Sequence, residues 1–214
     1  MLKGRGKQNR GEPMSARRRG WRRACWLVFG VLLALVRPAT AQESPAAEEP
    51  VINREYPLKA LFLYNFGSYA EWPPGAFSND QAPCVIGVLG SAPINDTLNQ
   101  IAAAKTIGGR KIVIEQFASV DEFKPCEILF IARGVAGPER RAAIEAMKTR
   151  PVLTVGESPE FAGEGGCVDF YVEANKIRLE INTTAVRQRQ LKLSSKLLAM
   201  ARIVDGAAAD PGKR

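Results

Sequence analysis

Cys84-Val85-Ile86-Gly87-Val88-Leu89 is the first of four short runs rich in valine and isoleucine, and these runs decide the expected fold. The other three runs span residues 111–116, 127–132 and 151–155. Short apolar runs of this kind are typical of parallel strands buried on both faces. Helix-like segments at 95–105 and 138–148 separate them. The alternation predicts an α/β fold, a single three-layer domain whose mostly parallel sheet is flanked by helices.

The C-terminal part of the chain predicts an antiparallel hairpin followed by a helix. Residues 168–172 and 177–181 alternate apolar and polar side chains with a period of two, across a turn at Ala174-Asn175. One face of this hairpin is therefore polar. A final helix is predicted to be capped by Ser194 and to have its apolar positions at Leu197, Met200, Ala201 and Val204.

Residues 56–73 form the most aromatic segment, and they predict a helix that begins near Pro57 and ends before Pro73. One face of this helix carries Leu58, Leu61, Phe62, Asn65 and Tyr69. A second apolar stripe carries Ala60, Leu63, Tyr64 and Gly67. A helix that is apolar on two sides either lies deep in the domain or keeps one face for a partner.

The N-terminal residues predict export. Arginines at 17–19, 22 and 23 precede an apolar run at 24–36, and small residues follow at 39–41. This pattern is typical of a secretory signal peptide, and the run is shorter than the roughly 20 residues of a membrane span. We therefore expect a signal peptide at 1–41, a disordered lead-in at 42–53, the domain at 54–205 and a flexible tail at 206–214, in a periplasmic protein. A retained N-terminal anchor is the alternative, and Met14 is an alternative start.

The net charge of +8 is concentrated in the predicted leader. Residues 1–41 hold ten of the 30 lysines and arginines and one of the 22 acidic residues, which leaves 20 basic and 21 acidic residues and a net charge of −1. A nearly neutral domain has little means of displacing counterions from phosphates, so nucleic-acid binding is not expected.

The residue types argue against catalysis. The chain contains no histidine, which excludes Ser-His-Asp and Cys-His nucleophile systems and histidine-ligated zinc. There is no phosphate-binding loop motif, and the carboxylates form no recognisable pair. We therefore predict a protein that is not an enzyme, with no cofactor and no metal site.

Three cysteines follow the leader. Cys84 and Cys126 each begin an apolar run, and at equivalent ends of neighbouring strands they could form a disulfide in an oxidising compartment. The alternative is two buried free thiols. Cys167 has no evident partner inside the chain, so we interpret it as a buried thiol, with intermolecular pairing left open.

A ligand crevice is predicted beyond the carboxyl ends of the parallel strands, where open α/β sheets bind ligands. Ser91, Arg133 and Ser158 fall at these ends. The alternative is that both serines cap helices and Arg133 is solvated.

Other residues are candidates for binding a ligand or a protein partner. Asn65 places an amide in an apolar helix stripe, where it needs hydrogen-bond partners, and Trp72 is of the type most often found at binding hot spots. Both also fit structural roles. The polar hairpin face offers Arg178, Glu180 and Asn182 to a partner, unless it is simply a solvated strand face.

Several segments of the chain carry a family resemblance. They are Lys59-Ala60, Phe62-Leu63-Tyr64-Asn65-Phe66 and Glu71-Trp72-Pro73, followed later by Val155-Gly156-Glu157-Ser158 and the residues 191–198. Together they resemble the YfiR/HmsC-like family of bacterial periplasmic proteins, over about residues 55–205.

This resemblance implies a specific function. It implies a repressor that binds the periplasmic sensor region of an inner-membrane diguanylate cyclase, lowers cyclic-di-GMP and thereby affects biofilm formation and motility. It also implies paired cysteines at 84 and 126, and relief of repression by an outer-membrane-associated partner. Cys167 lacks the neighbouring second cysteine of some relatives. The alternatives are a periplasmic small-molecule-binding module and a structural or enzymatic envelope protein. A homodimer through the hairpin edge is left open, because no feature of the sequence decides it.

Overall fold

The structure, a computed structural model, describes residues 51–204. The chain divides into the units Met1–Ala46 and Ala47–Arg214, and all described residues belong to the second. The predicted signal peptide, residues 42–50 of the predicted lead-in and the predicted tail lie outside the described residues. Their boundaries stay predictions.

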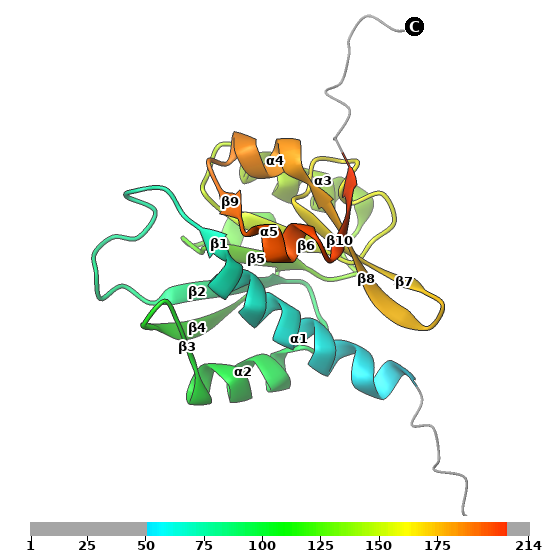
Figure 1. The fold of residues 1–214 in the computed structure, drawn as a ribbon, viewed down its shortest axis with the longest axis horizontal. Helices are drawn as coiled ribbons and strands as arrows, with labels where there is room; N and C mark the ends of the chain where they lie inside the picture. The colour runs from blue at the N-terminus through cyan, green and yellow to red at the C-terminus, as the bar shows by residue number, and fades with distance from the viewer. Residues whose placement is uncertain (1–50, 205–214) are drawn as a thin grey trace, which may run out of the picture. The chain divides into compact units, whose positions relative to one another are not determined.

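The helices and strands follow one another along the chain as Figure 1 shows. The helices are α1 (Val51–Tyr69), α2 (Asn95–Ala104), α3 (Gly137–Ala146), α4 (Thr183–Gln188) and α5 (Ser195–Leu198), with a 3-10 turn η1 (Val120–Glu122). The strands are β1 (Ala70–Glu71), β2 (Cys84–Leu89), β3 (Thr106–Ile107), β4 (Arg110–Phe117), β5 (Ile128–Ile131), β6 (Leu153–Gly156), β7 (Val168–Glu173), β8 (Lys176–Asn182), β9 (Lys192–Leu193) and β10 (Ala201–Val204).

Within residues 51–204, eight strands form one sheet in the order β10-β8-β7-β6-β5-β2-β4-β3. The neighbours from β4 across to β7 are parallel, and so are β8 and β10. The four predicted apolar runs correspond to β2, β4, β5 and β6, of which β5 and β6 are buried throughout. In Figure 1, α1 and α2 lie on one side of the sheet, and α3 and α4 lie on the other. The predicted α/β fold is therefore confirmed.

Strands β7 and β8 pair in antiparallel register from Val168↔Ile181 to Glu173↔Lys176. The two residues between them, Ala174 and Asn175, have φ values of 47° and 61°. Positive φ at both central positions is what a two-residue hairpin turn with the right twist requires. Because of this register, the apolar side chains of β7 and β8 lie on one shared face of the hairpin. This face packs against α1, where Phe170 stacks on Phe66 at a centroid distance of 5.8 Å.

The predicted C-terminal helix is wrong beyond its first turn. Ser194 does cap α5 by accepting a hydrogen bond from the Leu197 amide, but α5 ends at Leu198. Residues 201–204 instead form β10, which pairs with β8 in parallel register. The helix-like spacing of the apolar residues between 197 and 204 is only a weak indication of a helix. The open edge of β8 and the β-branched side chains of Ile203 and Val204 favour a strand instead.

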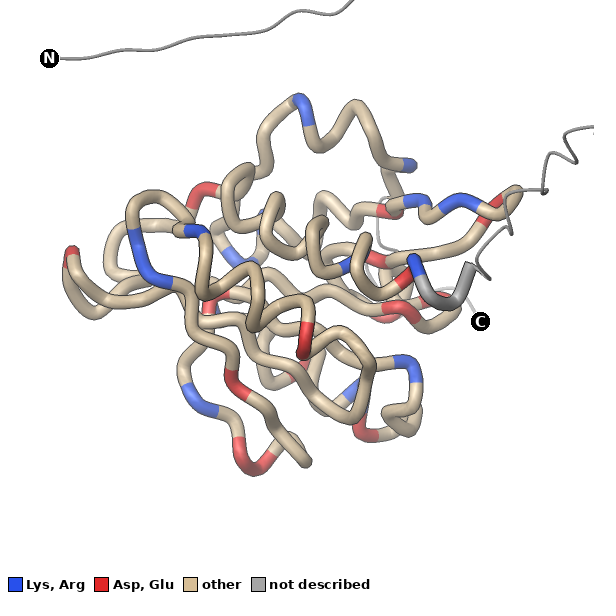
Figure 2. The backbone as a smooth tube through the Cα atoms, turned by 90° about the horizontal axis from the view of Figure 1, so that it is seen from below, with Lys and Arg blue, Asp and Glu red and all other residues tan. Residues whose placement is uncertain are grey.

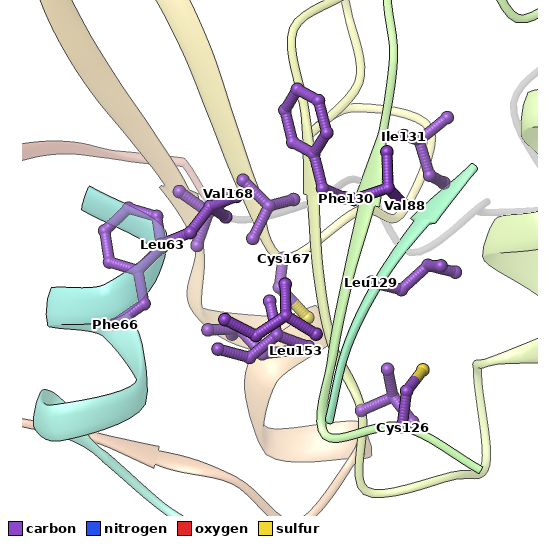
Figure 3. Close-up of a cluster of buried hydrophobic side chains, with 14 of the residues drawn as sticks. Leu63, Phe66, Val88, Cys126, Leu129, Phe130, Ile131, Leu153, Cys167 and Val168 are labelled. Atoms are coloured by element: carbon purple, nitrogen blue, oxygen red, sulfur yellow. The ribbon is translucent and has the colours of Figure 1, made fainter. Parts of the chain in front are cut away.

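Helix α1 also begins earlier than predicted. It starts at Val51, so Pro57 lies inside the helix instead of at its first position. Proline in a helix interior removes one backbone hydrogen bond. The helix continues through this position because tertiary packing supports it: Ala60, Leu63 and Phe66 are fully buried in the core. Figure 3 shows Leu63 and Phe66 in the same apolar cluster as Val168 and Leu153 of the sheet.

The cysteines of the described part, Cys84, Cys126 and Cys167, are free and buried. The predicted Cys84–Cys126 disulfide is therefore absent from the structure. The register Ile86↔Ile128 of β2 and β5, continued by two residues, sets Cys84 beside Cys126, so the two thiols do lie at equivalent ends of neighbouring strands as predicted. Burial, and next the carboxylate of Glu127, raise the pKa of both Cys84 and Cys126 to about 12, which makes both thiols poor nucleophiles.

No helix within the described residues combines the length and the apolar character that a membrane span requires.

Candidate functional site

A buried cluster of charges joins α1 to the carboxyl ends of β5 and β6. We call Glu55, Tyr56, Lys59, Arg133 and Glu157 the α1 charge cluster. Lys59 is only 1% exposed, and its ammonium group forms ion pairs with Glu55 at 2.5 Å and with the fully buried Glu157. Because an unpaired buried charge is very costly, these two carboxylates are what allows a lysine to occupy the core side of α1.

The sheet supplies the other half of the cluster. Glu157 directly follows β6, and its carboxylate accepts a hydrogen bond of 2.9 Å from the backbone amide of Arg133, two residues after β5. The Arg133 guanidinium lies 3.0 Å from Glu55 and 3.8 Å from Glu157. Tyr56 donates its hydroxyl to Glu157 at 3.4 Å. Two carboxylates and two cations therefore alternate, and they tie one turn of α1 to the ends of two strands.

Aromatic rings enclose the lysine. The Lys59 ammonium lies 5.1 Å from the ring centroid of Tyr56 and 5.8 Å from that of Phe170. A cation over a ring face is stabilised by the ring quadrupole, and more so when water is excluded. These contacts come from α1 itself and from β7, so they help to fix α1 over the sheet.

The pKa shifts follow from this arrangement. Burial would raise the pKa of Glu55, but the hydrogen bond and positive charge of Lys59, together with Arg133, outweigh it and lower the pKa below its ordinary value. Burial, and next the negative charge of Glu157, raise the pKa of Tyr56. The cluster therefore holds an ionised carboxylate and a neutral phenol, which is the arrangement of a structural ion-pair network.

Asp169 on β7 lies close to this cluster but points to the opposite face from Phe170. It is buried, and its Oδ1 atom has no hydrogen-bond partner within residues 51–204. Burial, and next the carboxylate of Glu180, raise the pKa of Asp169 to about 7, while Lys59 acts in the opposite direction.

The opposite side of α1 remains open to solvent. Leu58 is 42% exposed and Leu61 is 41% exposed, although leucines in a long apolar helix are usually covered. Asn65 lies on the same side and is half-buried, and its side-chain amide makes no hydrogen bond to another described residue. The sequence left open whether α1 lies deep in the domain or keeps one face uncovered, and in the structure one face is uncovered. We call Leu58, Leu61 and Asn65 the outer face of α1.

The predicted ligand crevice is brought together only in part. Arg133 belongs to the α1 charge cluster. Ser158 directly follows Glu157 and is buried, and its hydroxyl has no hydrogen-bond partner among the described residues. Ser91 is exposed after β2 and takes no part in the cluster. Trp72 is half-buried beside Phe77 at a centroid distance of 6.0 Å, and its Nε1 atom has no hydrogen-bond partner in the part of the chain that the structure describes.

The hairpin residues separate into different environments. Arg178 is exposed and lies 3.5 Å from Glu173, while Glu180 pairs with Arg202 of β10. Asn182 is not on an exposed polar face, so this part of the prediction is wrong. Its side chain is buried, accepts a hydrogen bond from the Ala185 amide at 2.8 Å and donates one to the Ala162 carbonyl at 2.7 Å. As β8 ends there, Asn182 becomes the cap of α4.

Glu55, Lys59 and Glu157 were not predicted as site residues. A lysine between the apolar residues Leu58 and Ala60, on a helix with two apolar stripes, is the feature that could have identified Lys59, because such a lysine needs a buried carboxylate. Nothing local to residue 157 identifies that carboxylate. The two residues are 98 positions apart and meet only in the fold.

Among the described residues, no group of cysteines, aspartates and glutamates could hold a metal ion. Basic and acidic positions are interspersed along the backbone in Figure 2, which differs from the continuous basic stripe of a nucleic-acid-binding surface. A shallow cavity of about 510 Å³ lies elsewhere, between the end of α2 and β4, and its lining includes Tyr64, Lys105 and Lys111.

Comparison with known proteins identifies the family. No curated protein matches the chain significantly. The family model described as YfiR/HmsC-like matches residues 56–202, which include most of α1, the α1 charge cluster except Glu55, and the whole sheet up to β10. This match covers well over half of the chain, and the chain therefore belongs to the YfiR/HmsC-like family.

Proposed function

We propose that the protein is a periplasmic regulator without catalytic activity, which binds the periplasmic sensor region of a membrane diguanylate cyclase and represses it. Family membership suggests a periplasmic regulator of such a cyclase. The predicted signal peptide and the lack of histidine in the sequence support the same function. The expected result of binding is a lower level of cyclic-di-GMP.

The observation that carries this proposal is the outer face of α1. It lies in the segment that carries the family resemblance, and it exposes Leu58 and Leu61 beside the side-chain amide of Asn65, which makes no hydrogen bond to another residue of the described part. The centre of a protein interface is more apolar than the rest of the protein surface, and an exposed pair of leucines on a fixed helix fits such a centre. We assign this face to the contact with the cyclase.

The α1 charge cluster supports the assignment through rigidity. Ordering a helix at the moment of binding would reduce affinity, because the entropy lost must be subtracted from the contact energy. Ion pairs from Lys59 and Arg133 and the buried stripe Ala60, Leu63 and Phe66 fix α1 before any partner arrives. The outer face is therefore presented in a preformed state.

The test is the cyclic-di-GMP level in a deletion strain complemented with wild-type protein, with Leu61→Glu or with Val113→Glu. Val113 is 36% exposed on β4, far along the sheet order from β7, and serves as the matched control. Wild type and Val113→Glu should lower cyclic-di-GMP, and Leu61→Glu should leave it at the deletion level while melting at the wild-type temperature. Wild type without effect would overturn the function. Full repression by Leu61→Glu would overturn the assignment of the surface alone.

A second candidate is the binding of a small anionic or aromatic molecule at the cavity near α2. Its volume of about 510 Å³ falls in the range of ligand sites. Lys105 lies over the Tyr64 ring at 5.4 Å, so a cation and an aromatic surface are presented together. A thermal-shift screen of aromatic carboxylates would favour this function if a hit is abolished by Lys111→Ala.

A further inference from the structure

Two tyrosines border the outer face of α1, and each has a lysine over its ring. The Lys105 ammonium lies 5.4 Å from the ring centroid of Tyr64, and the Lys196 ammonium lies 5.4 Å from that of Tyr69. With about 3.6 residues per turn, Tyr64 and Tyr69 fall on opposite sides of Leu61 around the helix. The exposed leucines therefore lie between two pairs of an aromatic ring and a cation.

Two further lysines extend this border. Lys111 lines the same cavity as Lys105, between α2 and β4. Lys192 of β9 lies opposite Glu71 of β1, the strand that directly follows α1. Figure 1 shows α1 between α2, which Lys105 follows, and α5, which contains Lys196. We call the four exposed lysines the lysine border: Lys105, Lys111, Lys192 and Lys196.

Positive charge is concentrated in this part of the domain. Residues 183–204 contain five lysines and arginines and no acidic residue, although the chain after residue 41 has a net charge of −1. Glu71, just beyond the end of α1, lies opposite Lys192, and Glu55, in the first turns, is held by ion pairs in the α1 charge cluster. Because the local potential depends on the nearest charges, the surface around the outer face is positive.

We infer that the outer face of α1 and the lysine border bind the surface of a membrane that contains anionic phospholipid. The exposed Leu58 and Leu61 lie among the head groups, with the tyrosine rings beside them, and the lysine ammonium groups pair with the lipid phosphates. An apolar centre with aromatic rings and lysines around it is typical of helices that lie on a membrane surface. Lysine is depleted in protein interfaces, so a border of lysines favours lipid phosphates over an acidic protein surface.

The membrane contact does not rest on the proposed cyclase contact, although both use Leu58 and Leu61. A protein held at the membrane surface meets a membrane cyclase by lateral diffusion. The sensor region of the cyclase then takes the place of lipid at the two leucines. Lipid binding therefore has to be measured with purified protein and without a cyclase.

The first experiment is co-sedimentation of the exported protein with vesicles of phosphatidylcholine and phosphatidylglycerol in equal parts, and with vesicles of phosphatidylcholine alone. Wild type should bind only the anionic vesicles, and about 1 M salt should release it because the Debye length falls to about 3 Å. Lys105→Glu with Lys196→Glu should weaken binding on the order of 100-fold, since each lysine near an anionic surface contributes about 1 kcal/mol and glutamate adds repulsion.

The matched control is Lys124→Glu with Lys148→Glu, which changes the net charge equally at two exposed lysines outside the lysine border. This variant should bind within about threefold of wild type, because charges farther away than the Debye length are screened. Wild type that binds neither kind of vesicle, or both equally, overturns the proposal. An equal loss in the two double variants also overturns it, because the effect then belongs to the net charge.

A second experiment tests the contact surface. The native cysteines of the described part are buried, so an environment-sensitive fluorophore can be attached selectively to Leu61→Cys or to Lys148→Cys. Anionic vesicles should shift the emission of the first label to the blue and leave the second unchanged. An unshifted label at residue 61 on bound protein would overturn the outer face as the contact. Displacement from the vesicles by excess glycerol phosphate would assign the lysines to a soluble phosphate compound and overturn the lipid surface.

The two proposals fail separately. Vesicle binding by a protein that does not repress cyclic-di-GMP in cells overturns the cyclase function alone. Repression by wild type that binds no anionic vesicle overturns the membrane contact alone.

Discussion

Lys59 of α1 and Glu157 at the end of β6 form an ion pair in which the two side chains are 1% and 0% exposed. Because burial removes water from both groups, each charge is stabilised by the other and by the contacts with Glu55, Arg133 and Tyr56. Removing one member of such a pair leaves an uncompensated charge in the core. The pair therefore makes the position of α1 depend on a residue that is 98 positions away in the chain.

Lys59→Met should lower the free energy of unfolding by about 3 kcal/mol, the effect of breaking a buried ion pair while keeping the side-chain volume. Urea denaturation followed by circular dichroism measures it. Lys124→Met is the control, because Lys124 is 67% exposed in its pair with Glu115 and should change stability by less than about 1 kcal/mol. Equal effects of the two substitutions would show that burial of the pair is irrelevant.

Asn182→Ala should destabilise the protein by about 2 kcal/mol, because it removes the cap of α4 and also leaves the buried Ala162 carbonyl without its donor. Ser194→Ala removes only the cap of α5 and should cost about 1 kcal/mol. Thermal unfolding of both variants compares the two caps. An effect of Asn182→Ala no larger than that of Ser194→Ala would contradict a double role for Asn182.

Part of this molecule could be predicted because its determinants are local. The valine- and isoleucine-rich runs identify β2, β5 and β6, since a strand buried on both faces has to be apolar. They also identify β4, although β4 lies near the edge of the sheet and exposes Lys111, Val113 and Gln116. The aromatic segment at 56–73, which carries part of the family resemblance, identifies α1. The α1 charge cluster could not be predicted as a unit, because Lys59, Arg133 and Glu157 are brought together only by the order of the strands.

The errors have the same physical origin. The local sequence of residues 201–204 is compatible with a helix, but in the folded protein these residues pair with the open edge of β8. The alternating pattern of β8 predicts a polar strand position at Asn182, but β8 ends there and the Asn182 side chain caps α4. In both cases a long-range contact decides between two local conformations of similar energy.

The pH dependence of stability should carry a contribution from Asp169. In the folded protein its pKa is about 7, against an ordinary value of 3.8. Between these two values the folded state binds a proton that the unfolded chain has released, so the free energy of unfolding falls as the pH rises from about 4 to about 7. Asp169→Asn resembles the neutral acid and should be more stable than wild type at pH 8, by on the order of 3 kcal/mol, with little difference near pH 4.

Denaturation of wild type and Asp169→Asn at several pH values measures this difference. The exposed Asp80 provides the control, and Asp80→Asn should follow the wild-type profile. A constant difference between Asp169→Asn and wild type at all pH values would contradict titration of Asp169 and indicate a packing effect.

Gly156, the last residue of β6, should not tolerate a side chain. A Cβ atom there would lie 2.4 Å from the Phe161 ring, which is fully buried and has no room to move. Gly156→Ala should therefore lower the free energy of unfolding by about 3 kcal/mol through overpacking. It should also disturb the neighbouring Glu157 and so loosen α1.

Gly134→Ala is the matched control, because nothing lies within 4 Å of its added Cβ atom and no positive φ forbids alanine there. This substitution should leave stability unchanged or raise it by about 0.5 kcal/mol, since alanine restricts the unfolded chain. Hydrogen exchange of the α1 amides reports the coupling to Glu157: faster exchange in Gly156→Ala and wild-type exchange in Gly134→Ala are expected. Unchanged protection of α1 in Gly156→Ala would mean that α1 is fixed by its apolar stripe and not by the α1 charge cluster.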